Sequence, residues 1–158
     1  MKKYGLIAIL VAVLDQIIKA YVRSLPVGKT FFQIPGILSL THCVNTGAAF
    51  SMLAGHTAAI ALVSLGLLAG IGIYAARKLH LTHSAWIAVA CLAGGGTGNL
   101  LDRLLFSGVT DYIRLQFIDF PVFNLADIAI TASVAVLLIL LASDTLEKPT
   151  EDIHGSGY

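Results

Sequence analysis

Four stretches of about twenty mostly apolar residues dominate this sequence, and each is long enough to cross a bilayer as a helix. They lie at about residues 4–23, 57–76, 85–105 and 122–142. Hydrophobic residues make up 57% of the 158 residues, charged residues only 12%, and the mean hydropathy is +0.86. The sequence therefore predicts an all-α polytopic membrane protein of one domain, residues 1–158, and not a soluble globule.

The distribution of lysine and arginine indicates how the spans are oriented. One side of the predicted membrane carries Lys2, Lys3, Arg77, Lys78 and Lys148, and the other carries Lys29 and Arg114, with Arg23 and Arg103 at its edge. Because cytoplasmic loops carry the excess of positive charge, both termini are expected in the cytoplasm. The apolar run after Lys2 and Lys3 imitates a signal peptide, but no small-x-small cleavage site follows it, so an uncleaved first span is expected.

The segments outside the spans have distinct characters. The long outer loop at residues 24–56 contains two β-prone runs, Thr30–Ile34 and Ile37–His42, split by a Pro-Gly pair. They predict a small β-sheet that lies on the outer membrane surface. The outer segment 106–121 mixes apolar and charged residues and is expected at the membrane interface. The polar cytoplasmic tail, residues 143–158, is expected to be disordered.

Polar residues inside the predicted spans share one depth. At a rise of 1.5 Å per residue, Asp15 lies about 12 Å and Asp127 about 9 Å from the outer ends of their spans. The third span places Asn99, Asp102 and Arg103 near its outer end. A carboxylate inside a span is unfavourable unless it faces the bundle interior or a water pocket. The shared depth therefore predicts a functional site in the outer leaflet.

Individual polar pairs in the spans have two interpretations each. Asp15 and Lys19 are four residues apart and share a helix face. They form either a self-neutralising pair that lets the span insert or a pair that positions the site. Arg103, four residues after Asn99, either reaches to lipid headgroups or belongs to the site. Both questions are open from the sequence.

Glycines spaced by four residues occur in two predicted spans. They are Gly66 with Gly70, and the run Gly94–Gly98, which contains GxxxG spacing. This spacing favours close helix packing in both places. The triple glycine does not predict a phosphate loop, because it follows no strand and lacks the Gly-Lys-Ser/Thr ending.

Several function classes find no support in the sequence. The net charge of +1 gives no indication of nucleic-acid binding. Cys43 and Cys91 form no CxxC pair, and neither HExxH nor GxSxG occurs. His42 neighbours Cys43 on a predicted strand, where adjacent side chains point to opposite faces, so the two do not suggest a thiol protease. The aspartates remain as the candidate chemical groups.

Asp111 and Asp127 are the two aspartates that can meet at the membrane surface. Asp111 lies in Val109–Tyr112, just before the fourth span, and Asp127 near that span's outer end. Two neighbouring carboxylates do not both ionise easily, so they share one proton. The ionised member can activate water, and the protonated member can donate to a scissile carbonyl. Such a pair titrates as a unit, so neither residue is assigned one role.

Two functions from other classes are alternatives to a protease. A small proton-coupled transporter would use intramembrane acids and bases as a proton relay. Transporters place their sites near the midplane between repeats, whereas this site is shallow and no repeat is visible. A non-catalytic assembly subunit would use the charges to hold helices together, but it leaves the polar loop Asn45–Ser51 unexplained.

Five motifs, in order along nearly the whole chain, resemble the lipoprotein signal peptidase (signal peptidase II) family of bacterial membrane aspartic proteases. The motifs are Asp15-Gln16-x-x-Lys19, Asn45-Thr46-Gly47-Ala48-Ala49-Phe50-Ser51, Gly95-x-x-Gly98-Asn99-x-x-Asp102-Arg103, Val109-x-Asp111-Tyr112-Ile113 and Phe123-Asn124-x-Ala126-Asp127. Tyr112 stands where phenylalanine is more usual in the family, which is a conservative difference.

The resemblance implies a fold and a set of functional residues. It implies four transmembrane helices with a small extracytoplasmic sheet, with Asp111 and Asp127 as the catalytic pair. Residues that would position the substrate or support the site are Asp15, Lys19, Asn45, Gly47, Gly95, Asn99, Arg103, Asn124 and Ala126.

The resemblance also implies a substrate and a location. The substrate would be the signal peptide of a lipidated prolipoprotein, cleaved just before a cysteine that carries diacylglycerol. The enzyme would be a monomer in the bacterial cell (inner) membrane, in contact with membrane lipid, with its active site in the outer leaflet. It implies no metal, no organic cofactor and no nucleic-acid partner.

Overall fold

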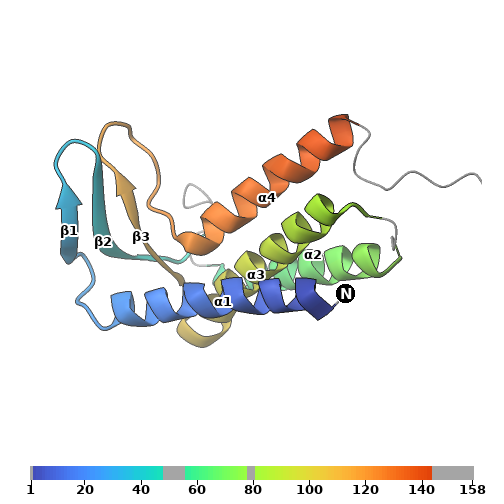
Figure 1. Cartoon of the computed structure of the whole chain (residues 1–158). Helices are drawn as coiled ribbons and strands as arrows, with labels where there is room; N and C mark the ends of the chain where they lie inside the picture. Colours follow the sequence, from blue (N-terminus) through green and yellow to red (C-terminus); the bar gives the residue numbers. More distant parts are fainter. Residues whose placement is uncertain (1, 48–55, 78–80, 144–158) are drawn as a thin grey trace, which may run out of the picture.

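The chain folds into four helices and one antiparallel sheet at one end of them (Figure 1). The computed structural model describes residues 2–47, 56–77 and 81–143. The helices are α1 (Lys2–Arg23), α2 (Thr57–Arg77), α3 (His83–Phe106) and α4 (Leu125–Ala142). The sheet has the order β1 (Thr30–Ile34), β2 (Leu38–Asn45) and β3 (Val109–Leu115). The predicted fold class is therefore confirmed, while most of the predicted tail and residues 48–51 of the second motif lie outside the described residues.

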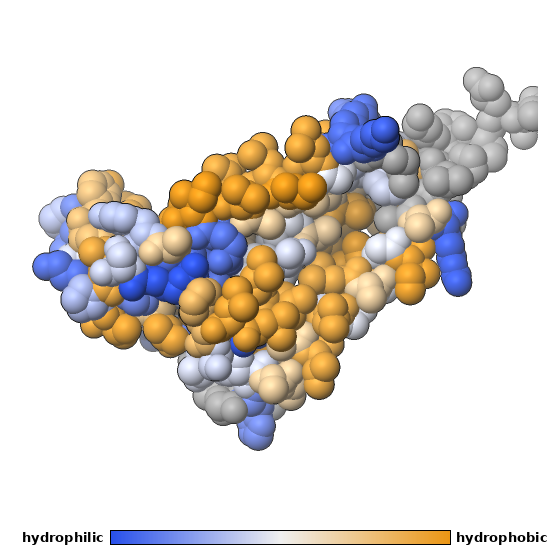
Figure 2. Space-filling view, turned by 90° about the horizontal axis from the view of Figure 1, so that it is seen from below, coloured by the Kyte–Doolittle hydropathy of each residue, from blue (hydrophilic) through white to orange (hydrophobic). Residues whose placement is uncertain are grey.

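All four helices are long and apolar enough to cross a membrane. Figure 2 shows a hydrophobic belt over the helices, with hydrophilic residues over the sheet and at the opposite end. Large apolar side chains in the belt are exposed, as Leu62 on α2 and Ile139 on α4 illustrate. In water this exposure would be unfavourable, whereas in a bilayer these side chains contact acyl chains. The chain is thus a multi-pass membrane protein.

Helix α3 is the centre of the bundle, because α1, α2 and α4 all pack on it. Its glycines permit this close approach. A Cβ atom added to Gly94 would lie 2.6 Å from the carbonyl oxygen of Ala8 on α1, and one added to Gly95 would lie 2.7 Å from that of Ala126 on α4. Both distances are too short for a real side chain, so the prediction of close packing holds for these α3 glycines.

The same prediction is wrong for Gly66 and Gly70 on α2. A Cβ atom added at either position would meet nothing within 4 Å among the described residues. The two glycines instead face a shallow apolar cavity of about 510 Å³ between α2 and the inner parts of α3 and α4. GxxxG spacing identifies a helix face without large side chains, but it does not show whether a neighbouring helix packs against that face.

The fourth helix begins at Leu125 rather than at residue 122, because Asn124 caps it. The Asn124 side chain accepts a hydrogen bond from the Asp127 amide at 2.9 Å, and the Asp127 carboxylate accepts one from the Asn124 amide at 3.2 Å. This reciprocal arrangement is a capping box. Asp127 therefore has a fixed orientation at the first turn of α4.

The sheet contains one strand that the sequence analysis did not identify. Strands β1 and β2 form the predicted hairpin, which turns at Gly36 with a φ of 74°, a backbone conformation that glycine adopts readily. Strand β3 comes from the outer segment 106–121 and pairs antiparallel with β2. Its pairing places Asp111 opposite Cys43 and Val109 opposite Asn45. Asp111 thus sits on a paired strand within the outer segment.

Candidate active site

Asp111 and Asp127 line one cavity of about 670 Å³ where the sheet meets the bundle. Strand β3 carries Asp111, and the first turn of α4 carries Asp127. Asn45, Asn99 and Arg103 line the same cavity. The structure therefore brings together side chains from β2, α3, β3 and α4 that the sequence places up to about eighty residues apart.

Two asparagine amides connect the two carboxylates. The Asn124 amide donates to Asp111 Oδ1 at 2.7 Å and to Asn99 Oδ1 at 3.2 Å. The Asn99 amide in turn donates to Asp127 Oδ1 at 2.8 Å. Each carboxylate is thus held by an amide, and the two amides are hydrogen-bonded to each other. The arrangement fixes the two acids relative to one another without a direct contact between them.

The surroundings of Asp111 favour its protonated form. The side chain is 2% exposed, and burial raises its pKa, as does the negative charge of Asp127. Hydrogen bonds from Asn45 and Asn124 lower the pKa, because they stabilise the carboxylate. The net result raises the pKa of Asp111 to about 7. Near neutral pH this acid can therefore gain or lose a proton, as a dyad that shares one proton requires.

Lys19 contacts three side chains and is fully buried. Its Nζ atom lies 2.8 Å from Asp15 Oδ2 and 3.4 Å from Asp102 Oδ2, and it donates to Asn99 Oδ1 at 2.7 Å. The contact with Asp15 fits the self-neutralising pair. The contact with Asn99 adds a link to the acids, because a donor at Oδ1 directs the amide nitrogen of Asn99 toward Asp127.

The backbone at the start of α4 is held by α1 and α3. Asp15 Oδ1 accepts a hydrogen bond from the amide of Ala126 at 3.1 Å, and Ala126 is fully buried. Gly98 lies directly against the Asp15 carboxylate, and Gly95 lies against the carbonyl of Ala126. These small residues support the site through packing, since larger side chains would separate α3 from α1 and α4.

Arg103 points toward the cavity and the outer loop, not toward lipid headgroups. Its guanidinium donates to the carbonyl of Asn99 at 3.2 Å and to that of Gly47 at 3.4 Å. Its Nε atom is buried and has no hydrogen-bond partner among the described residues. The amide of Gly47 donates to Asn45 Oδ1 at 2.9 Å, which leaves the Asn45 amide free to donate to Asp111 Oδ2 at 3.1 Å.

Asp102 is a central residue that the sequence analysis quoted in a motif but did not place in the site. It is fully buried and accepts hydrogen bonds from Gln16 at 2.9 Å, Arg23 at 3.0 Å and the Thr110 amide at 2.8 Å. The last bond fixes β3 one residue before Asp111. The sequence feature that could have indicated its role is its depth in the span, which is similar to that of Asn99 on the same helix.

Tyr112 also supports the site, and no sequence feature indicated its partner. Its hydroxyl accepts a hydrogen bond from the Leu125 amide at 3.2 Å, which joins β3 to the start of α4. A phenylalanine at this position would not make this bond.

Other catalytic chemistries find little support in the described part of the chain. His42 Nδ1 bonds to the carbonyl of Leu25 at 2.8 Å, so this ring is directed away from the thiol of Cys43. Among the described residues no group of three or more histidine, cysteine, aspartate or glutamate side chains could hold a metal ion. A pair of carboxylates that shares a proton can instead activate a water molecule directly.

Comparisons with known proteins agree with this geometry. The family model described as signal peptidase (SPase) II matches residues 7–143. A lipoprotein signal peptidase of Streptococcus pneumoniae is 36% identical over 152 residues, which cover 92% of this chain and 98% of that protein. One from Gloeobacter violaceus is 40% identical over 137 residues, covering 86% of this chain and 79% of that protein.

Two solved structures, both described as bacterial membrane enzymes, have the same fold. One has a TM-score of 0.86 at 27% identity and covers all of this chain and 96% of that one. The other has a TM-score of 0.82 at 30% identity, with 92% and 96% covered. With four membrane helices, a small sheet and a family model that matches most of its length, the chain belongs to the signal peptidase II family of membrane proteases.

Proposed function

We propose that this protein removes the signal peptide from prolipoproteins, and that Asp111 and Asp127 activate the water that cleaves the bond just before a diacylglyceryl-modified cysteine. The observation that carries the proposal is the cavity in which both carboxylates, tied together by Asn99 and Asn124, meet an apolar wall. The printed names of the curated relatives, lipoprotein signal peptidases, support the same substrate class.

The shape of the cavity supports a lipidated substrate. From Asp127 the cavity continues along α4 past Ile128 and Thr131 to Ala135. Eight helical residues correspond to about 12 Å, which is long enough to hold the first part of an acyl chain. Burial of an acyl chain contributes about 0.8 kcal/mol per CH₂ group. A lipid anchored in this cavity and the adjoining bilayer would hold the modified cysteine close to the dyad.

The proposed reaction is general acid–base hydrolysis. The ionised carboxylate takes a proton from water, whose oxygen attacks the scissile carbonyl, while the protonated carboxyl donates its proton to the carbonyl oxygen. The resulting tetrahedral intermediate collapses when the C–N bond breaks and a carboxyl proton passes to the leaving amine. Since the two acids titrate together, neither is assigned one role.

Arg103 and Asn45 are placed to hold the substrate backbone during this reaction. Both line the cavity, and none of the described residues accepts the hydrogen of the buried Nε of Arg103. A substrate carbonyl that accepted this hydrogen would satisfy a buried donor, which is favourable by about 1–3 kcal/mol. No cofactor takes part in the proposed mechanism.

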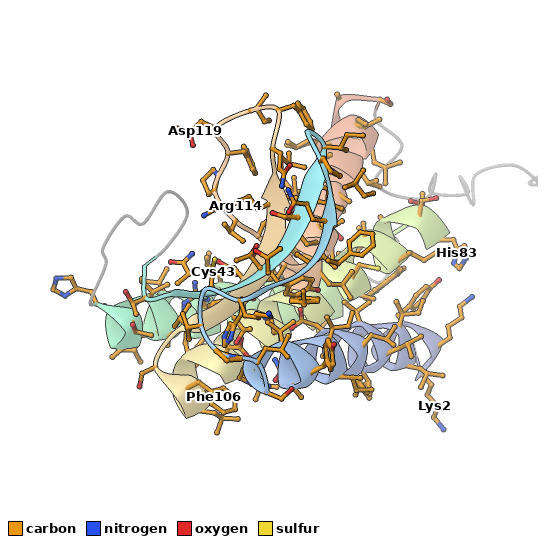
Figure 3. The ribbon with its side chains drawn as sticks, turned by 90° about the vertical axis from the view of Figure 1, so that its left-hand side faces the viewer. Lys2, Cys43, His83, Phe106, Arg114 and Asp119 are labelled. Atoms are coloured by element: carbon orange, nitrogen blue, oxygen red, sulfur yellow. The ribbon has the colours of Figure 1, made fainter. Side chains whose placement is uncertain are left out.

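We further propose that the sheet and the dyad face the extracytoplasmic side, in the outer leaflet. Lys2, Lys3 and Arg77 lie at the helix ends away from the sheet (Figure 3 labels Lys2). The excess of positive charge supports a cytoplasmic location for that end. Impermeant thiol reagents would label a cysteine introduced at Lys29 only from outside, and labelling from the cytoplasm alone would contradict this orientation.

The transporter and the assembly subunit fit less well than the protease. The chain belongs to a peptidase family, which supports neither alternative. Part of the polar network does hold helices together, since Asp15 joins α1 to α4 and Asp102 joins α3 to α1 and β3. Packing alone, however, does not explain two acids that face a cavity.

The decisive test uses one precursor with and without prior diacylglyceryl transfer, in the same membrane mimic. Asp111→Asn and Asp127→Asn should each abolish cleavage of the lipidated precursor in a protein that remains folded. Arg77→Ala, which removes an exposed charge at the end of α2 away from the sheet, serves as the control and should retain activity. Normal turnover by either dyad variant would contradict the catalytic assignment, and equal rates on the two precursors would contradict dependence on lipid.

A further inference from the structure

A second and larger cavity of about 990 Å³ lies beside the first, between the sheet and the loop that follows β3. Its floor is the face of the sheet that carries Gln33, Ser39 and Arg114. These residues form a row across the three strands, because Gln33 pairs with Ser39 and Ser39 pairs with Arg114. Side chains in such a row project from the same face of a sheet.

The two cavities share a wall. Phe120, Pro121 and Val122 line the cavity that contains the dyad and also line this second cavity. A polypeptide that passes through the dyad cavity therefore only has to cross residues 120–122 to reach the second cavity. The continuity makes the second cavity an extension of the candidate active site toward the sheet.

The second cavity is polar, and its charged side chains are exposed. Arg114 and Asp119 both line it, and within the described part of the chain the side chain of neither forms an ion pair or a hydrogen bond. Figure 3 shows both residues at the sheet end of the molecule, away from Lys2 and His83. The cavity thus offers one exposed cation and one exposed anion beside the side-chain amide of Gln33 and the hydroxyl of Ser39.

We propose that this second cavity binds the polar polypeptide segment that follows the scissile bond, so that Arg114 and Asp119 are substrate-binding residues on the product side. The inference rests on the proposed function, because it takes the dyad cavity as the place where the bond is cut. It assigns the apolar cavity along α4 to the lipid and the polar cavity on the sheet to the mature chain.

The direction of the substrate supports this assignment. The apolar wall along α4 leads into the bilayer and suits acyl chains and an apolar signal segment. The segment after the cysteine is polar and leaves the membrane, so it needs a path over the sheet. In the second cavity its backbone amides and carbonyls can bond to Asp119 and Arg114, respectively, which replaces hydrogen bonds to water. A peptide bound there would also restrict the position of the scissile bond and hold it close to the dyad.

The test compares two lipidated precursors that differ only after the cleavage site. One continues with a short polar segment after the modified cysteine, and the other ends at that cysteine as an amide. The wild-type enzyme should cleave the longer precursor with a kcat/KM about tenfold higher, as expected for one or two hydrogen bonds to charged groups. The double variant Arg114→Ala/Asp119→Ala should cleave the two precursors with equal kcat/KM. This value should match that of the wild-type enzyme on the shorter precursor.

The shorter precursor is also the control for folding, because the double variant should cleave it with the same kcat/KM as the wild type. Arg77→Ala, at the other end of the bundle, is the matched surface control and should keep the full preference for the longer precursor. Equal cleavage of the two precursors by the wild type would overturn the inference and leave the proposed function intact.

Two other outcomes would also overturn it. If the variant loses the same factor on both precursors, and the factor depends on whether the lipid headgroups are anionic, the cavity binds lipid headgroups instead. If the wild type cleaves neither lipidated precursor, the proposed function fails and the inference falls with it.

Discussion

Replacement of Asp111 by asparagine should make the protein gain stability relative to the wild type as the pH rises. Asp111 is 2% exposed, and its pKa rises from 3.8 to about 7 in the folded protein through burial and the charge of Asp127. In the unfolded protein this residue lies outside the four spans, is exposed to water and has an ordinary pKa of about 3.9. The fold thus binds a proton that the unfolded chain releases.

The sign and the size of the effect follow from linkage. A group whose pKa is higher in the folded state contributes its full stability below the unfolded pKa and loses it as the pH rises to the folded pKa. A difference of about three in pKa corresponds to about 4 kcal/mol above pH 7, and about 3 kcal/mol of it is lost between pH 5 and pH 8. Asparagine is neutral at every pH, so it avoids this loss, while its amide nitrogen replaces one of the two oxygens that accept hydrogen bonds from Asn45 and Asn124 at a cost that does not depend on pH.

The assay is the free energy of unfolding of the purified protein in one detergent at pH 5 and pH 8. The stability of Asp111→Asn relative to the wild type should increase by about 3 kcal/mol between the two pH values. Asp119→Asn removes an exposed carboxylate near the same strand and should show no such increase. If the stability of Asp111→Asn relative to the wild type is the same at both pH values, the ionised form of Asp111 does not destabilise the folded protein, and the reasoning is refuted.

Two further predictions concern packing and pH. Gly98→Ala should lower the free energy of unfolding by about 1–3 kcal/mol, because the new methyl group would overlap the Asp15 carboxylate. Gly66→Ala should be neutral or slightly stabilising in the same unfolding assay. Equal losses of stability in the two variants would contradict the close packing of α3 at Gly98. Asn45→Ala removes a hydrogen bond that lowers the pKa of Asp111, so this pKa should rise in the variant. The fall of kcat/KM at alkaline pH should therefore occur at higher pH than in the wild type. A shift to lower pH would contradict the role of Asn45 in stabilising the Asp111 carboxylate.

The four spans could be predicted from the sequence because each helix exposes its apolar side chains to lipid. In a membrane, hydropathy and length specify a helix directly, and no knowledge of tertiary packing is needed. The β1–β2 hairpin was also visible, since the Pro-Gly pair marks its turn. The start of α4 was missed because the apolar residues before Asn124 continue the hydropathy signal beyond the capping box.

Strand β3 could not be predicted, because its pairing partner lies about seventy residues earlier in the chain. Its residues alternate irregularly between apolar and polar, because the surroundings of one face change along the strand. Thr110 and Tyr112 hydrogen-bond to α3 and to the start of α4, whereas Arg114 on the same face lines the polar cavity. The role of Asp102 was hidden for a related reason. Its depth was predicted, but its bonds to Gln16, Arg23 and Thr110 depend on how α1, α3 and β3 assemble.

The sequence left open whether Lys19 only neutralises Asp15 or also positions the site, and the structure suggests an experiment that separates the two roles. Lys19→Met leaves Asp15 buried without its cation and removes one of the two cations beside Asp102. Removal of one partner of a buried ion pair destabilises a protein by about 3–5 kcal/mol. Asp15→Asn added to Lys19→Met removes the unpaired charge and retains an oxygen to accept the amide hydrogen of Ala126.

The double variant should therefore recover most of its stability but not its activity. Without the ammonium group Asn99 Oδ1 keeps the hydrogen bond from Asn124 but loses the one from α1, so the amide that donates to Asp127 is held less firmly. We expect kcat to stay about 10–100-fold below wild type, as for the loss of a group that orients a catalytic residue. The alkaline limb of the pH–rate profile should also shift, since a charge and a hydrogen bond near the dyad have changed. A double variant with wild-type kcat and an unchanged pH profile would show that Lys19 serves only to neutralise Asp15.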